Sequence, residues 1–489
     1  MTRMQVNEWK RAKTPFILFL SLLLIVLSYG GSGSKSYAAP LSLLNGIQFK
    51  DTSGNPVNAH GGGMIKSGSY YYWVGENRDG TNYVSLYRST DLKNWEFRAN
   101  ILSKSSASEL ATANIERPKL LYNAATGKYV LWAHKENGVD YGEAKVAVAS
   151  ASNIEGPYTY QGSFRPLDYD SRDMTVYNDN GTAYLISATR VNADLNIYRL
   201  TPDFLGVESL VQTLWAGSYR EAPAMFKRGS TYFLITSGAT GWTPNQQKYA
   251  TASSISGTWS ALSNFGDSRA SESQAAYIIP VEGSSSTSYL YMGDRWAGAW
   301  ERPANESKYV WLPLTFPSST TLSISWYPQL NIDSAAGTVA GTPFTVDSSL
   351  TYELINRKSE KALNIRASAT VNGADAEQWT DTNLPSERWT MIDAGDGYYK
   401  LKNTNSGLIL GPENGTTTDG TVIEQWSDGG WTSQHWQLID AGGGFFKLKN
   451  RATGKLIDVS SGALTDGANV IQWSDNNGLN QQWQIVVAN

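Results

Sequence analysis

Two series of tryptophans near the end of the chain repeat at a constant interval of 47 residues. Three copies of this length fill residues 349–489. One copy is too short to bury its own apolar face, whereas three copies around an axis can share one core. The repeat therefore predicts a β-trefoil. We expect one tryptophan of each copy to lie in the core, namely Trp389, Trp436 and Trp483.

Each copy also contains a Gln-Trp pair, followed by a short loop rich in Asp, Asn and Gly. This pattern resembles the ricin B-type lectin family, which occurs in carbohydrate-binding modules. The resemblance implies that each lobe binds sugar through an early Asp, the face of a Trp and a later Asn or Gln. The third lobe matches the pattern fully. Its expected sugar-binding residues are Asp458, Trp473, Asn480 and Gln481.

The other two lobes depart from this pattern. The second lobe has Gly411 where the early Asp is expected, which weakens the hydrogen bonding expected of that lobe. The first lobe has Glu387 at the position of the later Asn. Its candidate sugar-binding residues are Asn364 and Trp379.

A second, looser recurrence precedes the trefoil. Five residues that can bind or titrate on a sugar each stand a short distance before an aromatic-rich strand, at intervals of 56, 57, 48 and 53 residues. A repeat near this length, built from short strands, is typical of a β-propeller. The innermost strand of every blade faces the axis, so five segments should converge on one pocket. The five residues are His60, Glu116, Asp173, Glu221 and Gln274.

The predicted organisation is all-β, with a five-bladed propeller over residues 41–332 and a trefoil over residues 349–489. Turn pairs such as Asn180-Gly181 separate the strands and indicate hairpins. Residues 333–348 are rich in small side chains, and we interpret them as a linker.

The composition narrows the possible ligands. Charged residues make up 17% of the chain and aromatic residues 12%, which suits a protein that handles neutral, polar ligands with flat apolar faces. A net charge of −4 gives no reason to expect nucleic acid. Cysteine is absent and the three histidines lie far apart in the sequence, so we expect no metal site and no cofactor.

The N-terminus has the features of a secretory signal. A basic segment around Lys10 and Lys13 precedes an apolar run over residues 16–27, and Ala38 ends a stretch suited to cleavage. A run of 12 residues is shorter than the roughly 20 that span a bilayer. We therefore expect residues 1–38 to be removed, and the mature protein to be a secreted monomer without stable membrane insertion.

Three acidic residues occupy similar settings in the propeller segment. Glu116, Asp173 and Glu221 each open an apolar strand that ends at a turn containing glycine. A carboxylate in such a place is costly to bury without partners, and three at matching positions favour a shared pocket. Glycoside hydrolysis needs a proton donor and a second group that attacks or activates water. Glu221 is our candidate donor, because a buried setting or a neighbouring acid would raise its pKa.

The propeller segment resembles glycoside hydrolase family 43, whose members are five-bladed propellers with an inverting mechanism. The stretches IERPKLLYN, SRDMTVYNDNG and YREAPAMF resemble more narrowly its exo-β-1,3-galactanase branch. This resemblance implies release of galactose from the non-reducing end of β-1,3-galactan, the backbone of plant arabinogalactan proteins. The polysaccharide is then the expected partner.

The resemblance also implies individual roles. Glu221 falls on the general acid, and Asp173 falls on the acid that tunes its pKa. Glu116 and Gln274 fall on positions that hold the galactose on the water side. Further substrate contacts are expected from His60, Glu76, Arg117, Tyr141, Asn196 and Thr240.

One departure from the wider family concerns the catalytic base. Most members carry an Asp at the start of the first blade, whereas this chain has His60 in a segment without a carboxylate. Gln274 stands where the branch is thought to place a substitute. A neutral amide has no proton affinity near pH 7, so Gln274 would act as an imidic-acid tautomer, or would orient water while Glu116 takes the proton. A plain hydrogen bond from Gln274 to the sugar is a further alternative, and for His60 we favour a structural role on the axis.

Two other functions compete with the galactanase. One is another family-43 specificity, such as arabinofuranosidase or xylosidase, which the missing first-blade Asp disfavours. The other is a sugar-binding protein whose propeller has lost activity, which the presence of Glu221 and Asp173 disfavours.

Overall fold

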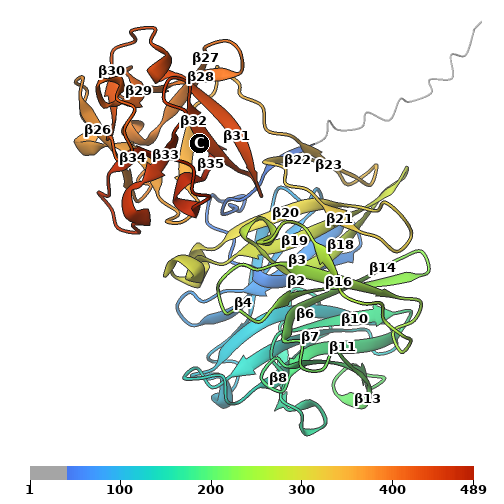
Figure 1. Ribbon diagram of the computed structural model, residues 1–489. Helices are drawn as coiled ribbons and strands as arrows, with labels where there is room; N and C mark the ends of the chain where they lie inside the picture. Colours follow the sequence, from blue (N-terminus) through green and yellow to red (C-terminus); the bar gives the residue numbers. More distant parts are fainter. Residues whose placement is uncertain (1–40, 489) are drawn as a thin grey trace, which may run out of the picture. The chain divides into compact units, whose positions relative to one another are not determined.

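The computed structural model describes residues 41–488, so the predicted signal peptide lies outside the described residues. The described part consists of β-strands connected by turns and short 3-10 helices, as the prediction of an all-β protein required (Figure 1). Within residues 41–488, no helix is long and apolar enough to cross a membrane.

Five four-stranded antiparallel sheets follow one another along the first part of the chain. The first two are β2 (His60–Ser67), β3 (Tyr70–Glu76), β4 (Asn82–Ser89) and β5 (Glu96–Ser103), then β6 (Asn114–Asn123), β7 (Lys128–Glu136), β8 (Lys145–Ala151) and β9 (Thr159–Phe164). The next two are β10 (Met174–Asp179), β11 (Thr182–Thr189), β12 (Asp194–Leu200) and β13 (Val207–Leu214), then β14 (Arg220–Arg228), β15 (Thr231–Gly238), β16 (Gln247–Ala252) and β17 (Ser263–Phe265). The fifth is β18 (Gln274–Glu282), β19 (Thr287–Arg295), β20 (Lys308–Thr315) and β21 (Ser323–Ile324).

The first strands of these sheets form a closed ring. Strand β2 contacts β6, β6 contacts β10, β10 contacts β14, β14 contacts β18, and β18 contacts β2. The five sheets are therefore the blades of a propeller, and the fold prediction is confirmed. The ring brings the first residues of five separated segments to one end of a common axis.

The hairpin turns follow from the residues that occupy them. Asn180 and Gly181 join β10 to β11 with φ values of 53° and 93°. Two consecutive positive φ values are the mark of a type I′ turn, which Asn-Gly adopts most readily. The glycines after His60 serve a different purpose, because a Cβ on Gly62 would lie 1.9 Å from the carbonyl oxygen of Val74.

The segment interpreted as a linker is partly a strand. A three-stranded sheet joins β1 (Leu41–Leu44), β22 (Gln329–Asp333) and β23 (Thr338–Thr342). Val339 packs in the same apolar cluster as strand β22, and a Cβ on Gly341 would lie 2.0 Å from the ring of Tyr327. The small residues thus permit close packing instead of flexibility, which corrects the linker boundary at 333.

The trefoil is one extended sheet of twelve strands. Its strands are β24 (Tyr352–Asn356), β25 (Ala362–Ile365), β26 (Ala374–Trp379), β27 (Trp389–Asp393), β28 (Tyr398–Asn403), β29 (Ile409–Pro412), β30 (Ile423–Trp426), β31 (Trp436–Gly442), β32 (Phe445–Asn450), β33 (Leu456–Val459), β34 (Val470–Trp473) and β35 (Trp483–Val487).

The two tryptophan series differ in burial, as expected: one series lies in the core and the other at the surface. Each tryptophan of the core series is fully buried and donates its indole N–H to a backbone carbonyl in an earlier strand of the same lobe. A buried indole needs such a partner, which explains why the same contact recurs three times. The tryptophans of the other series, one at the end of each Gln-Trp pair, are 38–40% exposed; these are Trp379, Trp426 and Trp473.

Candidate active site

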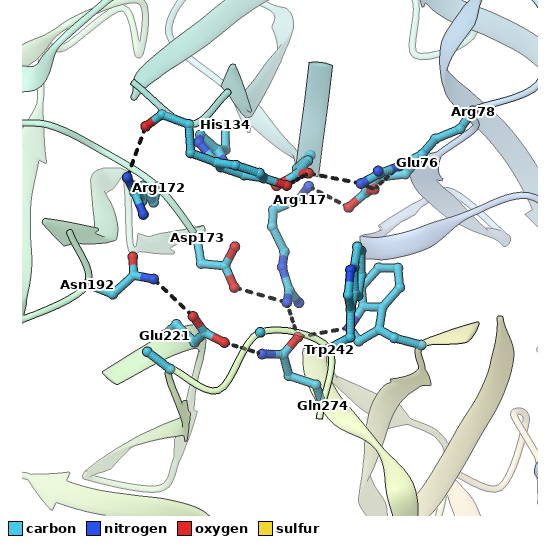
Figure 2. Close-up of a pocket in the computed structure, with 15 residues that line it drawn as sticks. Glu76, Arg78, Arg117, His134, Arg172, Asp173, Asn192, Glu221, Trp242 and Gln274 are labelled. Atoms are coloured by element: carbon cyan, nitrogen blue, oxygen red, sulfur yellow. Dashed lines mark hydrogen bonds and ion pairs between the residues drawn. The ribbon is translucent and has the colours of Figure 1, made fainter. Parts of the chain in front are cut away.

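A pocket of about 310 Å³ opens where the five blades converge (Figure 2). Four of the five recurring residues line it, each from a different blade: Glu116, Asp173, Glu221 and Gln274. The first blade contributes Glu76 at the end of β3 instead of His60. Four of the five predicted residues therefore meet at the pocket. In the first blade, the lining residue comes instead from β3, the strand next to the one that carries His60.

His60 lies away from the pocket lining, in the packed axis of the propeller. It is 1% exposed, and its Nδ1 lies 2.9 Å from Oδ1 of Asp294. Its ring stacks on that of Tyr309 at a centroid distance of 4.4 Å. This placement corrects the expected substrate contact and agrees with a structural role on the axis.

The innermost strands are bulged directly after the recurring residues. The register shifts after His60, Glu116 and Glu221, and the residue that follows each has a φ of 58°, 55° and 50° respectively. Bulges re-aim side chains and occur often beside active sites. Here each bulge changes the direction in which the side chain just before it leaves the strand.

A carboxylate accepts the backbone N–H at each of these bulges. The N–H of Gly61 donates to Oδ2 of Asp294 at 2.9 Å, and that of Arg117 donates to Oε1 of Glu76 at 3.0 Å. The N–H of Ala222 donates to Oδ2 of Asp173 at 3.2 Å. In every case the carboxylate belongs to the neighbouring blade, so the bulges link consecutive blades around the ring. Glu76, expected to contact substrate, has this structural task as well.

Glu221 is buried, and its carboxyl group is held by two neutral amides. Its Oε1 accepts a hydrogen bond from Nε2 of Gln274 at 3.0 Å, and its Oε2 accepts one from Nδ2 of Asn192 at 3.0 Å (Figure 2). Burial and then the negative charge of Asp173 raise the pKa of Glu221 to about 8, although Arg117 opposes the shift. The carboxyl group therefore holds its proton at neutral pH and is fixed by two amide donors.

Glu116 is buried as well, but its surroundings have the opposite character. Burial alone would raise its pKa, yet hydrogen bonds and positive charge hold the pKa of this carboxyl well below its usual range. Its Oε1 accepts bonds from Arg78 at 3.0 Å, Asn114 at 2.7 Å and Tyr141 at 2.7 Å. Its Oε2 lies 3.2 Å from Nδ1 of His134. Glu116 is thus a fully ionised carboxylate with every oxygen engaged.

His134 stands directly opposite Glu116 in the pairing of β6 with β7. Burial would lower its pKa, but the carboxylates of Glu116 and Glu136 outweigh this effect and raise the pKa to about 9. The Nε2 of His134 lies 2.8 Å from Oε1 of Glu136. The imidazole is therefore a cation at neutral pH, enclosed between two carboxylates.

Asp173 and Arg117 lie between the two glutamates. Arg117 Nη2 pairs with Oδ2 of Asp173 at 3.0 Å and also donates to Oε1 of Gln274 (Figure 2). The same guanidinium lies over the ring of Trp296. Asp173 and Arg117 both line the pocket, as expected. Through the contacts just described, Arg117 also holds the side chains of Asp173 and Gln274 in place.

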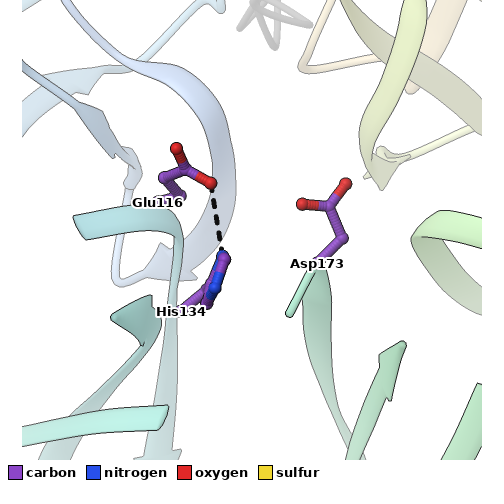
Figure 3. Close-up of side chains that lie close together, drawn as sticks. All are labelled: Glu116, His134 and Asp173. Atoms are coloured by element: carbon purple, nitrogen blue, oxygen red, sulfur yellow. Dashed lines mark ion pairs between the residues drawn. The ribbon is translucent and has the colours of Figure 1, made fainter. Parts of the chain in front are cut away.

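One group of metal-ligand types occurs among residues 41–488, formed by Glu116, His134 and Asp173 (Figure 3). One ligand atom from each lies within 4.8 Å of the others. Within this group, Nδ1 of His134 already pairs with Oε2 of Glu116 at 3.2 Å, and Asp173 pairs with Arg117 at 3.0 Å. The Oε1 atom of Glu116 moreover already accepts hydrogen bonds from three protein donors.

Two further predicted contacts lie outside the pocket lining. Asn196 is 1% exposed and binds Tyr198 and Thr213. Thr240 donates to the carbonyl oxygen of Thr243 in a turn beside the pocket, while its neighbours Ala239 and Gly241 line the pocket itself. Neither residue therefore contacts the cavity as expected, whereas Tyr141 does.

Several lining residues were not identified from the sequence: Arg78, His134, Arg172, Asn192, Trp242 and Trp296. They lie outside the first strands of the blades, so they are not among the five residues that recur along the sequence. Charged residues at the end of an apolar strand, such as His134 in KYVLWAH, were the available signal. The exposed Trp242 in a glycine-containing loop was another.

In the third lobe of the trefoil, part of the expected sugar site is present. Asn480 donates to Oδ1 of Asp458 at 2.9 Å beside the exposed Trp473. Gln481 is fully buried, and its amide bonds the backbone of Ser474 and Asn476. Gln481 therefore supports the loop instead of facing a ligand, which corrects its expected role.

In the first lobe, the predicted polar residue makes its contacts within the protein. Asn364 is 7% exposed and donates to Oε1 of Glu377 at 3.1 Å. Arg366 pairs with the other oxygen of Glu377 at 2.9 Å and with Asn469 at 2.6 Å. Asn364 is thus engaged within the protein, and Trp379 is the exposed member of the predicted pair.

The second lobe contains a pocket of about 420 Å³ despite Gly411. Glu424 stands opposite Gly411 in the pairing of β29 with β30 and lines this pocket. The exposed rings of Trp426 and Trp431 also line it. The carboxylate missing at position 411 is therefore available from the partner strand.

The chain matches two family models, "Glycosyl hydrolases family 43" over residues 54–274 and "Ricin-type beta-trefoil lectin domain-like" over residues 342–426 and 432–489. Among curated proteins no match is found. An exo-β-1,3-galactanase from Clostridium thermocellum is 47% identical, with 91% of this chain and 99% of that chain covered and a TM-score of 0.62.

Two further solved structures are similar. An exo-β-1,3-galactanase from Phanerochaete chrysosporium, solved as a Glu-to-Gln variant with β-1,3-galactotriose, is 28% identical over 91% of this chain and 99% of that chain, with a TM-score of 0.60. A family-43 β-1,3-galactosidase solved with galactodeoxynojirimycin is 32% identical over 58% of this chain and 99% of that chain, with a TM-score of 0.54.

These similarities and the pocket geometry agree on the class of the protein. A protonated carboxyl and an ionised carboxylate in one pocket are the two groups that glycoside hydrolysis generally uses. The chain is a glycoside hydrolase that belongs to glycosyl hydrolases family 43 and carries a C-terminal ricin-type β-trefoil lectin domain.

Proposed function

We propose that this protein is an inverting exo-β-1,3-galactanase, which releases galactose from the non-reducing end of β-1,3-galactan. The observation that carries the proposal is the carboxyl of Glu221. It is buried beside the negative charge of Asp173, and its pKa of about 8 keeps it protonated at neutral pH. The galactanases and the galactosidase described above support galactose as the sugar.

Glu221 acts as the general acid in this proposal. Its proton passes to the glycosidic oxygen as the bond to the anomeric carbon breaks, and the leaving chain departs as a neutral alcohol. A water molecule attacks the opposite face, which inverts the configuration. The proton that this water gives up passes to the solvent, from which Glu221 is protonated again before the next turnover. Asp173 serves as the charge that keeps Glu221 protonated.

Glu116 lies on the water side in the proposed orientation. Because three donors already bind its Oε1 and the cationic His134 faces its Oε2, its main task is to present a fixed negative charge together with Arg78 and Tyr141. Such a charge stabilises the positive character that develops on the sugar ring in the transition state. We infer no proton transfer to Glu116 at neutral pH, because its pKa is held far below its usual range.

The aromatic walls of the pocket suit a sugar ring. Trp242 is 42% exposed, and its ring lies 5.6 Å from that of Trp296 at an angle of 60°. Two indoles at this angle form a corner against which the apolar face of a galactose can pack. The exo mode of action is proposed from the similarity to the exo-β-1,3-galactanases described above.

Incubation with linear β-1,3-galactan tests the proposal. We expect monomeric galactose as the product, released first as the α-anomer in NMR spectra recorded during turnover. Release of sugar from arabinoxylan but not from galactan would instead assign another family-43 specificity. Absence of turnover on both, with binding to galactan retained, would indicate a sugar-binding protein.

The trefoil is proposed to hold the enzyme on the polymer through the second and third lobes. The double variant Trp426→Ala and Trp473→Ala should bind immobilised galactan at least about tenfold more weakly, since a stacked aromatic contributes roughly 1 kcal/mol or more. Turnover of a short β-1,3-galactooligosaccharide should be unchanged. Ile392→Ala is a matched control, because this residue is 37% exposed and lies outside both lobes' sugar sites. Unchanged binding by the double variant would contradict this role.

Secretion is also part of the proposal. Cleavage after Ala38 should leave Ala39 as the first residue of the mature protein. N-terminal sequencing of protein recovered from the culture medium checks this. Recovery only from the membrane fraction, with the first 38 residues retained, would contradict it.

A further inference from the structure

The second lobe of the trefoil differs from the third in the strand that carries its carboxylate. In each lobe, two residues stand directly opposite one another in an antiparallel pair of strands, so their side chains lie on one face of the hairpin. In the third lobe the acidic member of this pair is Asp458, opposite Ile471. In the second lobe it is Glu424, opposite Gly411. The two lobes therefore present one carboxylate each, from opposite strands.

Glu424 is buried without a cationic partner among residues 41–488. It is 9% exposed and lines the pocket of about 420 Å³ in this lobe. Its counterpart in the first lobe, Glu377, pairs with Arg366, but the second lobe has Glu413 at the position of that arginine. Burial raises the pKa of Glu424 and the charge of Glu413 adds to the shift, whereas the backbone N–H of Asn414 opposes it. A buried carboxylate in this setting is stabilised by hydrogen bonds from a ligand.

Two indole rings also line this pocket. Trp426 is 38% exposed and Trp431 is 54% exposed. A Cβ on Gly429 would lie 2.4 Å from the ring of Trp431, so this ring packs directly against the backbone of its own loop. A Cβ on Gly373 would lie 3.4 Å from the ring of Trp426. Each indole is therefore supported by backbone and still exposes part of its surface to the pocket.

The absence of a side chain at Gly411 allows the loop that carries Trp431 to lie close to β29. A Cβ at this position would lie 3.2 Å from the carbonyl oxygen of Ser433. In the third lobe, the residues at the places of Gly411 and Ser433 are Asp458 and Asn480, which form a hydrogen bond with each other. The glycine thus belongs to a site of different construction, in which a second indole takes the place of a polar pair.

The size of this pocket indicates more than one sugar unit. Its volume of about 420 Å³ exceeds the volume of about 310 Å³ of the active-site pocket, which takes one terminal galactose in the proposed function. The third lobe, by contrast, has one exposed indole, Trp473, and Gly478 stands where the second lobe has Trp431. The second lobe therefore offers twice the aromatic surface of the third.

We propose that the second lobe binds two consecutive units of a β-1,3-galactan chain, one packed on Trp426 and one on Trp431, with Glu424 accepting hydrogen bonds from their hydroxyl groups. A carboxylate accepts strong hydrogen bonds from hydroxyl groups, and the C–H face of a sugar ring packs on an indole, so these side chains suit a neutral saccharide. The third lobe, with one indole and the polar pair, binds one unit. The inference rests on the proposed function for the identity of the sugar.

Fluorine NMR of the full-length protein labelled with 5-fluorotryptophan follows each lobe separately from the active site. The Glu221→Gln variant is used so that oligosaccharides are not hydrolysed, and single Trp→Phe variants assign the signals. The probes are galactose and β-1,3-galactobiose. The signals of Trp426 and Trp431 should shift together, with a Kd for galactobiose at least about tenfold below that for galactose. The Trp473 signal should give Kd values for the two sugars that agree within about threefold.

Equal affinities for galactose and galactobiose at Trp426 and Trp431 would overturn the inference. It would also be overturned if these two signals did not shift at sugar concentrations that saturate the Trp473 signal. The titration does not depend on turnover. A wild-type enzyme that releases no galactose from galactan, while the second lobe still prefers the disaccharide, would refute the proposed function alone.

Two substitutions copy residues that the other lobes carry at the same places, which protects the test against misfolding. Trp431→Leu introduces the residue type of Leu384 in the first lobe, and it should raise the Kd for galactobiose, read at Trp426, to that for galactose. Glu424→Ile introduces the residue type of Ile471 in the third lobe, and it should weaken the binding of both sugars. An unchanged Kd for galactobiose in either variant would contradict the two-unit site.

Gly411→Asp separates this proposal from a third-lobe type of site that has merely lost its aspartate. The new side chain would crowd Ser433 and stand opposite Glu424, so the affinity for galactobiose should fall. Stronger binding of galactose by this variant would instead show a one-unit site and overturn the inference. Leu384→Ala is the matched control, because it truncates the residue at the place of Trp431 in the first lobe. Its second-lobe signals should titrate as in the parent protein.

Discussion

Glu116 and Glu221 occupy equivalent places in two blades, and both are buried, yet their protonation states at neutral pH are opposite. Around Glu116, three side-chain donors and the cationic His134 stabilise the charge. Around Glu221, only two neutral amides bind the carboxyl, and Asp173 adds a like charge. The same strand position and bulge thus yield an acid on one side and a permanent anion on the other, because the partners differ.

The largest effect is expected from Glu221→Gln, which removes the proton without changing the size of the side chain. Turnover of β-1,3-galactobiose should fall by roughly 10²–10⁴-fold, the usual value of a positioned acid. Binding of the galactan chain should persist, which can be measured by isothermal titration with a galactooligosaccharide. A variant that retains more than about a tenth of the wild-type rate would break the contrast between the two glutamates.

Asp173→Asn tests why Glu221 is protonated. Burial is the main cause of the raised pKa and Asp173 the second, so removal of this charge should lower the pKa from about 8. Because the protonated acid is the active form, the alkaline limb of the kcat/KM profile should move to lower pH, by roughly one unit for a neighbouring charge. A limb that stays in place or moves to higher pH would assign the shift to another group.

The smallest loss of activity is expected when one hydrogen-bond donor to Glu116 is removed. Tyr141→Phe removes one of its donors, a hydrogen bond of 2.7 Å. One such bond to a charged group contributes about 1.5–3 kcal/mol when buried, but Tyr141 is 44% exposed and water can replace it. We therefore expect a loss below about tenfold in kcat/KM on galactobiose, with an unchanged alkaline limb. A shifted limb would mean that Glu116 shares the proton of the acid.

The sequence predicted the fold and the residues that meet at the pocket better than it predicted the contacts of each of these residues. The constant 47-residue interval identified the trefoil core, because three buried indoles must meet equivalent partners. The recurrence of first-strand residues located four of the five blade contributions to the pocket. These features are repeated along the chain, and repetition is visible without coordinates.

The environment of each group depends on residues that meet only through closure of the ring. His134 comes from a second strand and Trp242 from a loop, and neither belongs to the recurring position. The bulges depend on φ values at Arg117 and Ala222, residue types that do not normally signal positive φ. Gln481 was assigned by its place in a motif, whereas its amide turns inward to hold a loop.

The central claim is that Glu221 carries a proton at neutral pH while Glu116 does not, and infrared difference spectroscopy tests it directly. At pH 7, the spectrum of wild type minus Glu221→Gln should show loss of a protonated carboxyl band. The spectrum of wild type minus Glu116→Gln should show loss of an ionised carboxylate band, and the Glu221 band should disappear as the pH rises through about 8. A carboxylate band assigned to Glu221 at pH 6 would contradict the account.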